Sequence, residues 1–223
     1  MLLALVLTLS PSAAQAQLRV REKPRAGSVE VSGSATFSGG YNAGTSAANE
    51  TRNPSTGSDP LSLFHAESSL GRAPGADVRL GVYVTPRISV EGGLQFSRSV
   101  LRARLTGDFE SAPEITAEHN VTQYVVDGSG LYHFGRFGGG RGVGFVLGGA
   151  GYVRELFEGN ASVQTGSEFH GGGGIKYWLG GGKHRIGVRA EGRASSRDAS
   201  TSLGGAPKRR LIPSASGGIV FLF

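Results

Sequence analysis

Residues 76–97 read ADVRLGVYVTPRISVEGGLQFS, and this stretch predicts two strands joined by a tight turn. Apolar and polar residues alternate on both sides of the turn at residues 84–87. Successive side chains of a strand point to opposite faces, so each strand has one apolar and one polar face. The apolar rows are Ala76, Val78, Leu80, Val82 and Val84, then Ile88, Val90, Gly92, Leu94 and Phe96.

The same period-two alternation recurs in six further segments, at residues 28–42, 123–134, 143–154, 169–179, 186–194 and 213–223. Short turns at 84–87, 135–141 and 180–183 alternate with long polar connections at 43–75, 101–117, 156–167 and 195–210. Short turns on one rim and long loops on the other are typical of up-and-down membrane barrels. The sequence therefore predicts an all-β fold, an eight-stranded antiparallel up-and-down transmembrane β-barrel.

The polar rows carry every charge within the predicted strands. In the segment at 143–154 we assign Phe145, Leu147 and Val153 to the outward row and Arg154 to the inward row. An eight-stranded barrel has an interior just wide enough for side chains, so inward charges must pair. We predict a lumen ion-pair network of Glu30, Asp77, Arg79, Glu91, Asp127, Arg154, Lys176, Arg189, Glu191 and Arg193. A polar path for protons, ions or very small solutes is the alternative.

The first residues have the layout of an export signal. An apolar run, Leu2–Leu7, precedes Ala14-Gln15-Ala16, which fits the A-x-A cleavage pattern. We expect a signal peptide at residues 1–16, a periplasmic N-terminal segment at 17–27 and a barrel domain at 28–223. The chain has no cysteine, so disulfides are excluded, and its net charge of +6 is scattered rather than organised as a nucleic-acid-binding module. No nucleic-acid partner is expected.

Aromatic residues gather near both predicted rims, among them Trp178 on the turn side, and the final residues Ile219, Phe221 and Phe223 alternate on one face. With the strand pattern, these features resemble the outer-membrane β-barrel superfamily of the OmpA-like type, without a peptidoglycan-binding domain. The resemblance implies a location in the cell outer membrane. It also implies contact with outer-membrane lipid, lipopolysaccharide and the barrel-assembly machinery, with Ile219, Phe221 and Phe223 as the assembly signal.

Chemistry-bearing motifs are sparse. The five histidines lack metal-ligand spacing, and the glycine-rich runs match no phosphate-binding loop, so we expect no metal, no cofactor and no enzyme activity. Ser129 and His133 share the inward face, but the sequence gives no further support for a catalytic group. We expect a structural or surface-interaction protein with a side-chain-filled lumen. The alternatives are a narrow porin-like channel and a soluble exported ligand-binding β-protein.

Two outer segments are candidates for interactions. The segment around 106–110 is expected to project as extended strands beyond the membrane, with no partner specified by the sequence. The basic run Lys208-Arg209-Arg210 is either a solvated charge run or a contact for lipopolysaccharide phosphates.

Overall fold

A computed structural model describes residues 24–49, 62–106, 113–157, 162–179, 185–199 and 208–223. The predicted signal peptide and residues 17–23 of the predicted periplasmic segment lie outside the described residues. None of the described residues forms a helix that is long and apolar enough to cross a membrane.

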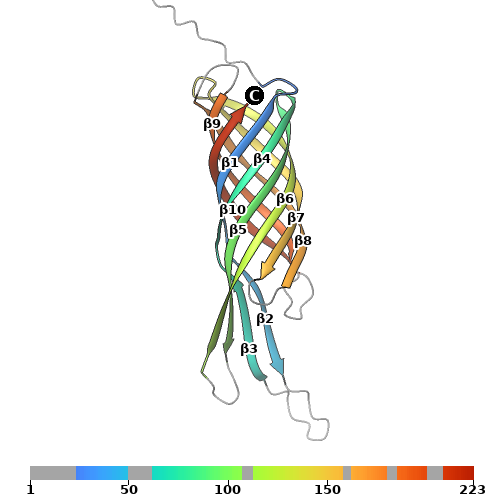
Figure 1. The fold of residues 1–223 in the computed structure, drawn as a ribbon, viewed down its shortest axis with the longest axis vertical. Helices are drawn as coiled ribbons and strands as arrows, with labels where there is room; N and C mark the ends of the chain where they lie inside the picture. Colours follow the sequence, from blue (N-terminus) through green and yellow to red (C-terminus); the bar gives the residue numbers. More distant parts are fainter. Residues whose placement is uncertain (1–23, 50–61, 107–112, 158–161, 180–184, 200–207) are drawn as a thin grey trace, which may run out of the picture.

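The described residues form ten antiparallel strands in one sheet (Figure 1). Their bounds are β1 Val29–Ser38, β2 Tyr41–Asn49, β3 Ser62–Leu70, β4 Ala73–Thr85, β5 Ile88–Thr106, β6 Ile115–Phe137, β7 Gly142–Phe157, β8 Ser162–Trp178, β9 Arg185–Ala199 and β10 Lys208–Leu222.

Eight of these strands close a ring. The order runs β1, β4, β5, β6, β7, β8, β9 and β10, and β10 pairs back onto β1 from Glu30 opposite Leu222 to Ser38 opposite Ser214. The eight-stranded antiparallel barrel predicted from the sequence is confirmed. The β4–β5 and β6–β7 turns and the chain end at Phe223 lie at one end of the barrel (Figure 1), which is called the turn-side mouth below. The predicted turn at 180–183 lies outside the described residues.

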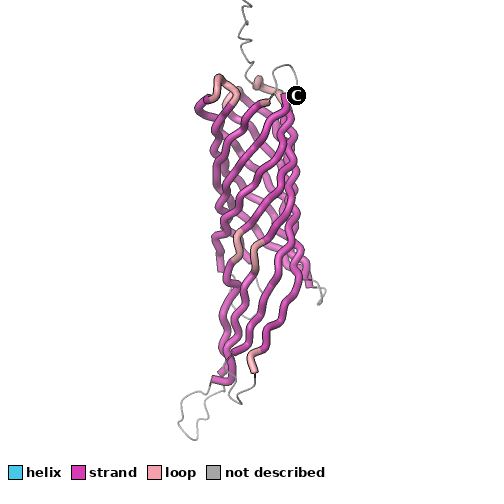
Figure 2. The backbone as a smooth tube through the Cα atoms, turned by 90° about the vertical axis from the view of Figure 1, so that its left-hand side faces the viewer, coloured by secondary structure: helices cyan, strands magenta, loops and turns pink. Residues whose placement is uncertain are grey.

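The connection at 43–75, predicted as a loop, instead contains most of the hairpin β2–β3. β3 pairs with the part of β5 that continues beyond the barrel, from Leu70 opposite Leu101 to His65 opposite Thr106. β5 and β6 stay paired as far as Leu105 opposite Ile115, so the projecting strands expected around 106–110 are present up to the undescribed tip. These four strands form one extension beyond the loop-side end (Figure 2). The edge of β5 accounts for the hairpin, because it offers unpaired backbone groups that β3 satisfies.

The barrel is apolar outside and polar inside. On β4, Val78 and Leu80 are 59% and 57% exposed, whereas Arg79 between them is 4% exposed. The predicted assignment of rows to faces is confirmed across β1, β4, β5, β6, β8, β9 and β10. Charges inside and hydrocarbon outside reverse the arrangement of a water-soluble protein.

The predicted faces of β7 are wrong. Phe145 and Leu147 are buried inside the barrel, whereas Val146 is exposed on the outside. Directly paired residues share a face of the sheet, and Phe145 lies opposite His133 on β6 and Gly174 on β8. Pairing with the neighbouring strands therefore determines which face of β7 points inward. The sequence of β7 did not indicate this, because both of its rows are apolar and no charged residue before Arg154 marks the inward row.

Glycine forms the β6–β7 turn. Gly138, Gly139 and Gly140 have φ values of 59°, 67° and 82°, in the left-handed region that side chains with a Cβ rarely adopt. The amide of Gly140 donates to the carbonyl of Phe137 at 3.1 Å. The predicted turn at 135–141 is therefore tight because of three consecutive glycines.

Candidate functional site: the filled lumen

The centre of the lumen holds a connected set of ion pairs. The guanidinium of Arg189 donates to both carboxylate oxygens of Glu91, with distances of 3.0 and 2.9 Å, and reaches Glu191 at 2.6 Å. Lys176 Nζ lies 2.5 Å from Glu30 and 3.3 Å from Glu91. Glu91 thus lies between Lys176 of β8 and Arg189 of β9, and Glu30, which is 3.6 Å from Arg189 Nη1, lies between the same two cations.

The network continues toward the loop side. Arg193 pairs with Glu191 and lies 3.6 Å from Asp127. Asp127 receives two hydrogen bonds from Arg79, at 3.0 and 3.3 Å, and Arg79 Nε donates to Asp77 at 2.7 Å. An unbroken series of charged side chains therefore crosses the barrel from Lys176 to Asp77, and it joins residues of six strands.

Phe145 supports the network through its ring face. Lys176 Nζ lies 5.2 Å from the ring centroid, and the guanidinium carbon of Arg189 lies 4.8 Å from it. A desolvated cation over an aromatic face is stabilised by the ring quadrupole. The reversed orientation of β7 thus places the aromatic ring of Phe145 in contact with both central cations of the lumen.

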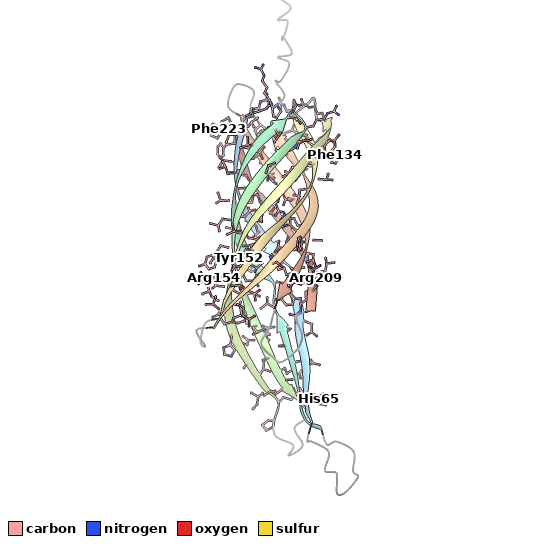
Figure 3. All side chains as sticks on the ribbon, turned by 90° about the vertical axis from the view of Figure 1, so that its right-hand side faces the viewer. His65, Phe134, Tyr152, Arg154, Arg209 and Phe223 are labelled. Carbon is pink, nitrogen blue, oxygen red and sulfur yellow. The ribbon has the colours of Figure 1, made fainter. Side chains whose placement is uncertain are left out.

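Arg154 lies on the outer surface of the barrel, so its predicted membership of the lumen network is wrong. Figure 3 shows Arg154 near Tyr152 on the outer side, toward the loop-side end. The reversed register of β7 turns Arg154 outward and turns Glu155, which is 5% exposed, inward. The structure brings the other predicted lumen residues together inside the barrel.

Four lumen residues escaped the sequence analysis. Arg197 pairs with Glu168 across β8 and β9, and its Nη1 donates to Gln123 at 3.4 Å. Gln123 Nε2 in turn donates to Glu155 at 2.8 Å. A usable signal existed for two of them: Arg197 follows Arg193 by four residues, and Glu168 precedes His170 by two. Both keep the inward phase, Arg197 within the predicted loop at 195–210 and Glu168 just before the predicted strand at 169–179.

The inward histidines accept or donate hydrogen bonds with serines. Ser129 Oγ lies 2.8 Å from His170 Nε2, and His170 Nδ1 lies 3.5 Å from Glu168. His133 lies against Ser89, not Ser129, with 3.0 Å between Nε2 and Oγ. The row of serine, histidine and carboxylate has the order of a catalytic triad. Ser129, His170 and Glu168 are each less than a tenth exposed, and Ser129 also donates to Asp127 at 3.3 Å, so we interpret the row as part of the lumen network.

An apolar layer closes the network toward the turn-side mouth. Tyr83, Trp178, Val220 and Leu222 pack together, and Tyr83 Oη donates to Glu30 at 3.1 Å. Trp178 is 4% exposed and faces the lumen, as its place on the polar row of the predicted strand at 169–179 indicates. Pairing with β9 sets this face, since Trp178 lies opposite Gly187, whose missing side chain leaves space for the indole.

Inward glycines leave room for the charged side chains. A Cβ on Gly93 would lie 2.9 Å from Arg79 Nη1 and 3.0 Å from Asp127 Oδ2. A Cβ on Gly81 would lie 2.8 Å from Cγ of Glu91. All three distances are shorter than ordinary carbon contacts, so these glycines are part of the geometry of the ion pairs.

The remaining predicted positions are on the outside. Ile219, Phe221 and Phe223 project outward from the end of the chain, with exposed fractions of 52%, 38% and 57%; their role in assembly stays a prediction. Phe223 and Phe134 lie near the turn-side mouth in Figure 3. Among the described residues, no cluster of three or more His, Asp and Glu side chains is placed to hold a metal ion.

Solved structures identify the architecture. The outer membrane protein OprG from Pseudomonas aeruginosa aligns over 90% of this chain and 97% of its own, with 9% identity and a TM-score of 0.55. The chain has the fold of the small outer-membrane β-barrels. Ail, the attachment invasion locus protein of Yersinia pestis, is 12% identical over 89% of this chain and 99% of its own, with a TM-score of 0.46. Neisserial surface protein A is 13% identical over 88% and 97%, with a TM-score of 0.43. No protein-family model and no curated protein sequence matches the chain.

Proposed function

We propose that the protein is an exported integral outer-membrane barrel with a lumen closed by ion pairs, and that its specific interactions take place on the four-stranded extension. The fold and the apolar exterior support the membrane location. Exterior residues such as Val78, Val90 and Val126 are more than half exposed on neighbouring strands. Soluble proteins rarely expose contiguous apolar patches larger than a few hundred square ångströms. A lipid environment removes the unfavourable contact of these apolar side chains with water, whereas the soluble ligand-binding alternative leaves them exposed to water.

The closed lumen rests on one observation, the unbroken ion-pair network. Its side chains are at most 8% exposed, from Lys176 at 0% to Arg193 at 8%. A permeating ion has to separate paired charges in a space without bulk water. Breaking a buried pair leaves an uncompensated charge at a cost of about 3–5 kcal/mol. The network therefore favours a structural plug over the porin-like alternative.

Planar-bilayer recordings test the closed lumen. We expect the wild-type barrel to insert without steady unitary current. In the double variant Glu91→Ala/Arg189→Ala, the bidentate pair is removed without leaving either partner alone, and we expect current steps through the opened centre. Retained heat-modifiable gel mobility shows that both proteins are folded. Reproducible unitary steps from the wild-type protein would instead establish the narrow channel.

The extension supports the interaction role. Residues 115–120 of β6 pair with β5, and the pairing of β6 with β7 begins only at Val121, so among the described residues one edge of β6 has no strand partner there. Open edges can receive an added strand from a partner. Exposed ion pairs, Arg102 with Glu118 and Arg104 with Glu114, keep charge on this part of the sheet. Charge on an exposed strand limits uncontrolled self-association.

A trimmed barrel tests the interaction role. Gly40 packs against the backbone of Leu70 and Gly71, so the chain can be rejoined there by a short turn that replaces residues 41–70. We expect the trimmed protein to keep its heat-modifiable mobility. We also expect it to lose binding to immobilised extracellular proteins that retain the full-length barrel. Equal retention of both proteins would exclude β2–β3 as the interaction surface and leave the open edge of β6 as the candidate surface.

A further inference from the structure

A cavity of about 440 Å³ opens at the turn-side mouth of the barrel. Residues of the β4–β5 and β6–β7 turns form its wall, together with the ends of β8 and β9. The apolar layer of Tyr83 and Trp178 forms its floor and separates it from the ion-pair network. The volume is within the range of sites that enclose small organic ligands. This cavity is called the vestibule below.

The described residues that line the vestibule include three arginines and no acidic side chain. Arg87, Arg136 and Arg185 line it. Arg87 and Arg136 are exposed, and neither guanidinium forms an ion pair with a described residue. A concave surface with charges of one sign concentrates the opposite ion from solution. Guanidinium groups also match carboxylates and phosphates geometrically, because their donors form a planar fork.

His133 adds an unsatisfied polar atom to this wall. It is 5% exposed and lines the vestibule, and its ring stacks on Tyr83 with centroids 5.0 Å apart. Nε2 is engaged by Ser89, whereas Nδ1 is buried and has no hydrogen-bond partner. A buried polar atom without a partner is costly, so a ligand that supplies the missing hydrogen bond is favoured. With Nε2 accepting from Ser89, Nδ1 carries the proton, and the ring must turn for this buried donor to reach an anion in the vestibule.

We propose that the vestibule binds small aromatic carboxylates. The arginines and His133 hold the carboxylate, and the ring packs on the floor formed by Tyr83 and Trp178. A cationic ligand is disfavoured because Glu30 and Glu91 lie behind this floor and are already paired with Lys176 and Arg189. The proposal does not depend on a closed lumen or on the extension, because every group that it uses lies at the opposite end from the extension.

The chain offers a built-in reporter for this site, since Trp178 is its single tryptophan. Benzoate is the probe, titrated into the full-length barrel in nanodiscs of zwitterionic lipid while the fluorescence of Trp178 is excited at the red edge. We expect a saturable change with benzoate and a much weaker response to benzyl alcohol, which has the same ring without the charge. Inorganic phosphate should compete with benzoate by occupying the arginines alone.

Paired variants separate the site from general charge effects. Arg87→Gln/Arg136→Gln should raise the dissociation constant for benzoate about tenfold or more, because two charge-assisted contacts are lost. The control, Arg98→Gln/Arg154→Gln, removes the same charge from the outer surface toward the other end and should leave the constant unchanged. His133→Phe keeps a ring against Tyr83 and should weaken binding. A response that is absent, that benzyl alcohol reproduces, or that survives Arg87→Gln/Arg136→Gln would overturn the proposal.

Discussion

Arg189 donates two hydrogen bonds of nearly equal length, 3.0 and 2.9 Å, to the carboxylate of Glu91 across the centre of the lumen. The two residues come from β9 and β5, which are not neighbours in the sheet. Both side chains are 2% exposed. Because it links opposite walls of the barrel, this pair stabilises the cross-section in a way that no backbone hydrogen bond between adjacent strands does.

The first prediction concerns the loss of one partner. Glu91→Ala leaves Arg189 and Lys176 with too few carboxylates in a space that excludes water. We expect the free energy of unfolding to fall by about 3–5 kcal/mol, the usual cost of an uncompensated buried charge. Urea unfolding in detergent micelles, followed by Trp178 fluorescence, measures the change. Arg102→Ala/Glu118→Ala removes an exposed pair instead and should change stability by less than about 1 kcal/mol. Similar losses in the two variants would contradict this account.

The second prediction concerns space inside the barrel. Gly93→Ala places a methyl group against Arg79 and Asp127, at 2.9 and 3.0 Å before any adjustment. We expect a loss of about 1–3 kcal/mol, as for other overpacked interiors. Gly128→Ala is the matched control, because its Cβ meets nothing within 4 Å on the outside of the barrel. The measurement is the difference in urea midpoint between the two variants. Equal midpoints would show that Arg79 and Asp127 shift to accommodate the methyl group without loss of stability.

The third prediction concerns the orientation of β7. The chain has no cysteine, so single cysteines report accessibility without background. Arg154→Cys should react quickly with a water-soluble maleimide, and Glu155→Cys should react only after unfolding. The physical reason is the register that turns Arg154 outward and Glu155 inward. Faster labelling at residue 155 than at residue 154 would restore the register first predicted from the sequence.

The barrel itself was predictable because charged residues identify the inward face of most of its strands. On β4, Asp77 and Arg79 cannot face lipid, so Val78 must, and a single charged row fixes the phase of a whole strand. β7 lacks such a marker before Arg154, because Phe145, Val146 and Leu147 are apolar on both rows. Its phase is set by pairing with β6 and β8, and that information is absent from the strand's own sequence.

The extension and the outer part of the lumen were missed for a different reason. Beyond the barrel both faces of the extension's strands meet water, so apolar alternation is lost while backbone pairing continues. Arg197 lay in a segment predicted as a loop and Glu168 directly beside one, although the two residues pair across β8 and β9. The separation of His133 and Ser129 into different hydrogen bonds depends on which strands are neighbours in the closed ring. Shared periodicity alone does not specify those partners.

The last prediction joins the reversed β7 to the network. Phe145→Leu keeps an apolar side chain in the lumen but removes the aromatic face beneath Lys176 and Arg189. A desolvated cation–π contact contributes up to about 2 kcal/mol, so we expect a measurable loss of stability in urea unfolding. Phe134→Leu is the control, because Phe134 is 48% exposed on the outer surface. The double variant Phe145→Leu/Lys176→Met should lose less than the sum of its single changes if the ring acts through the cation. Strict additivity would show that Phe145 contributes only volume.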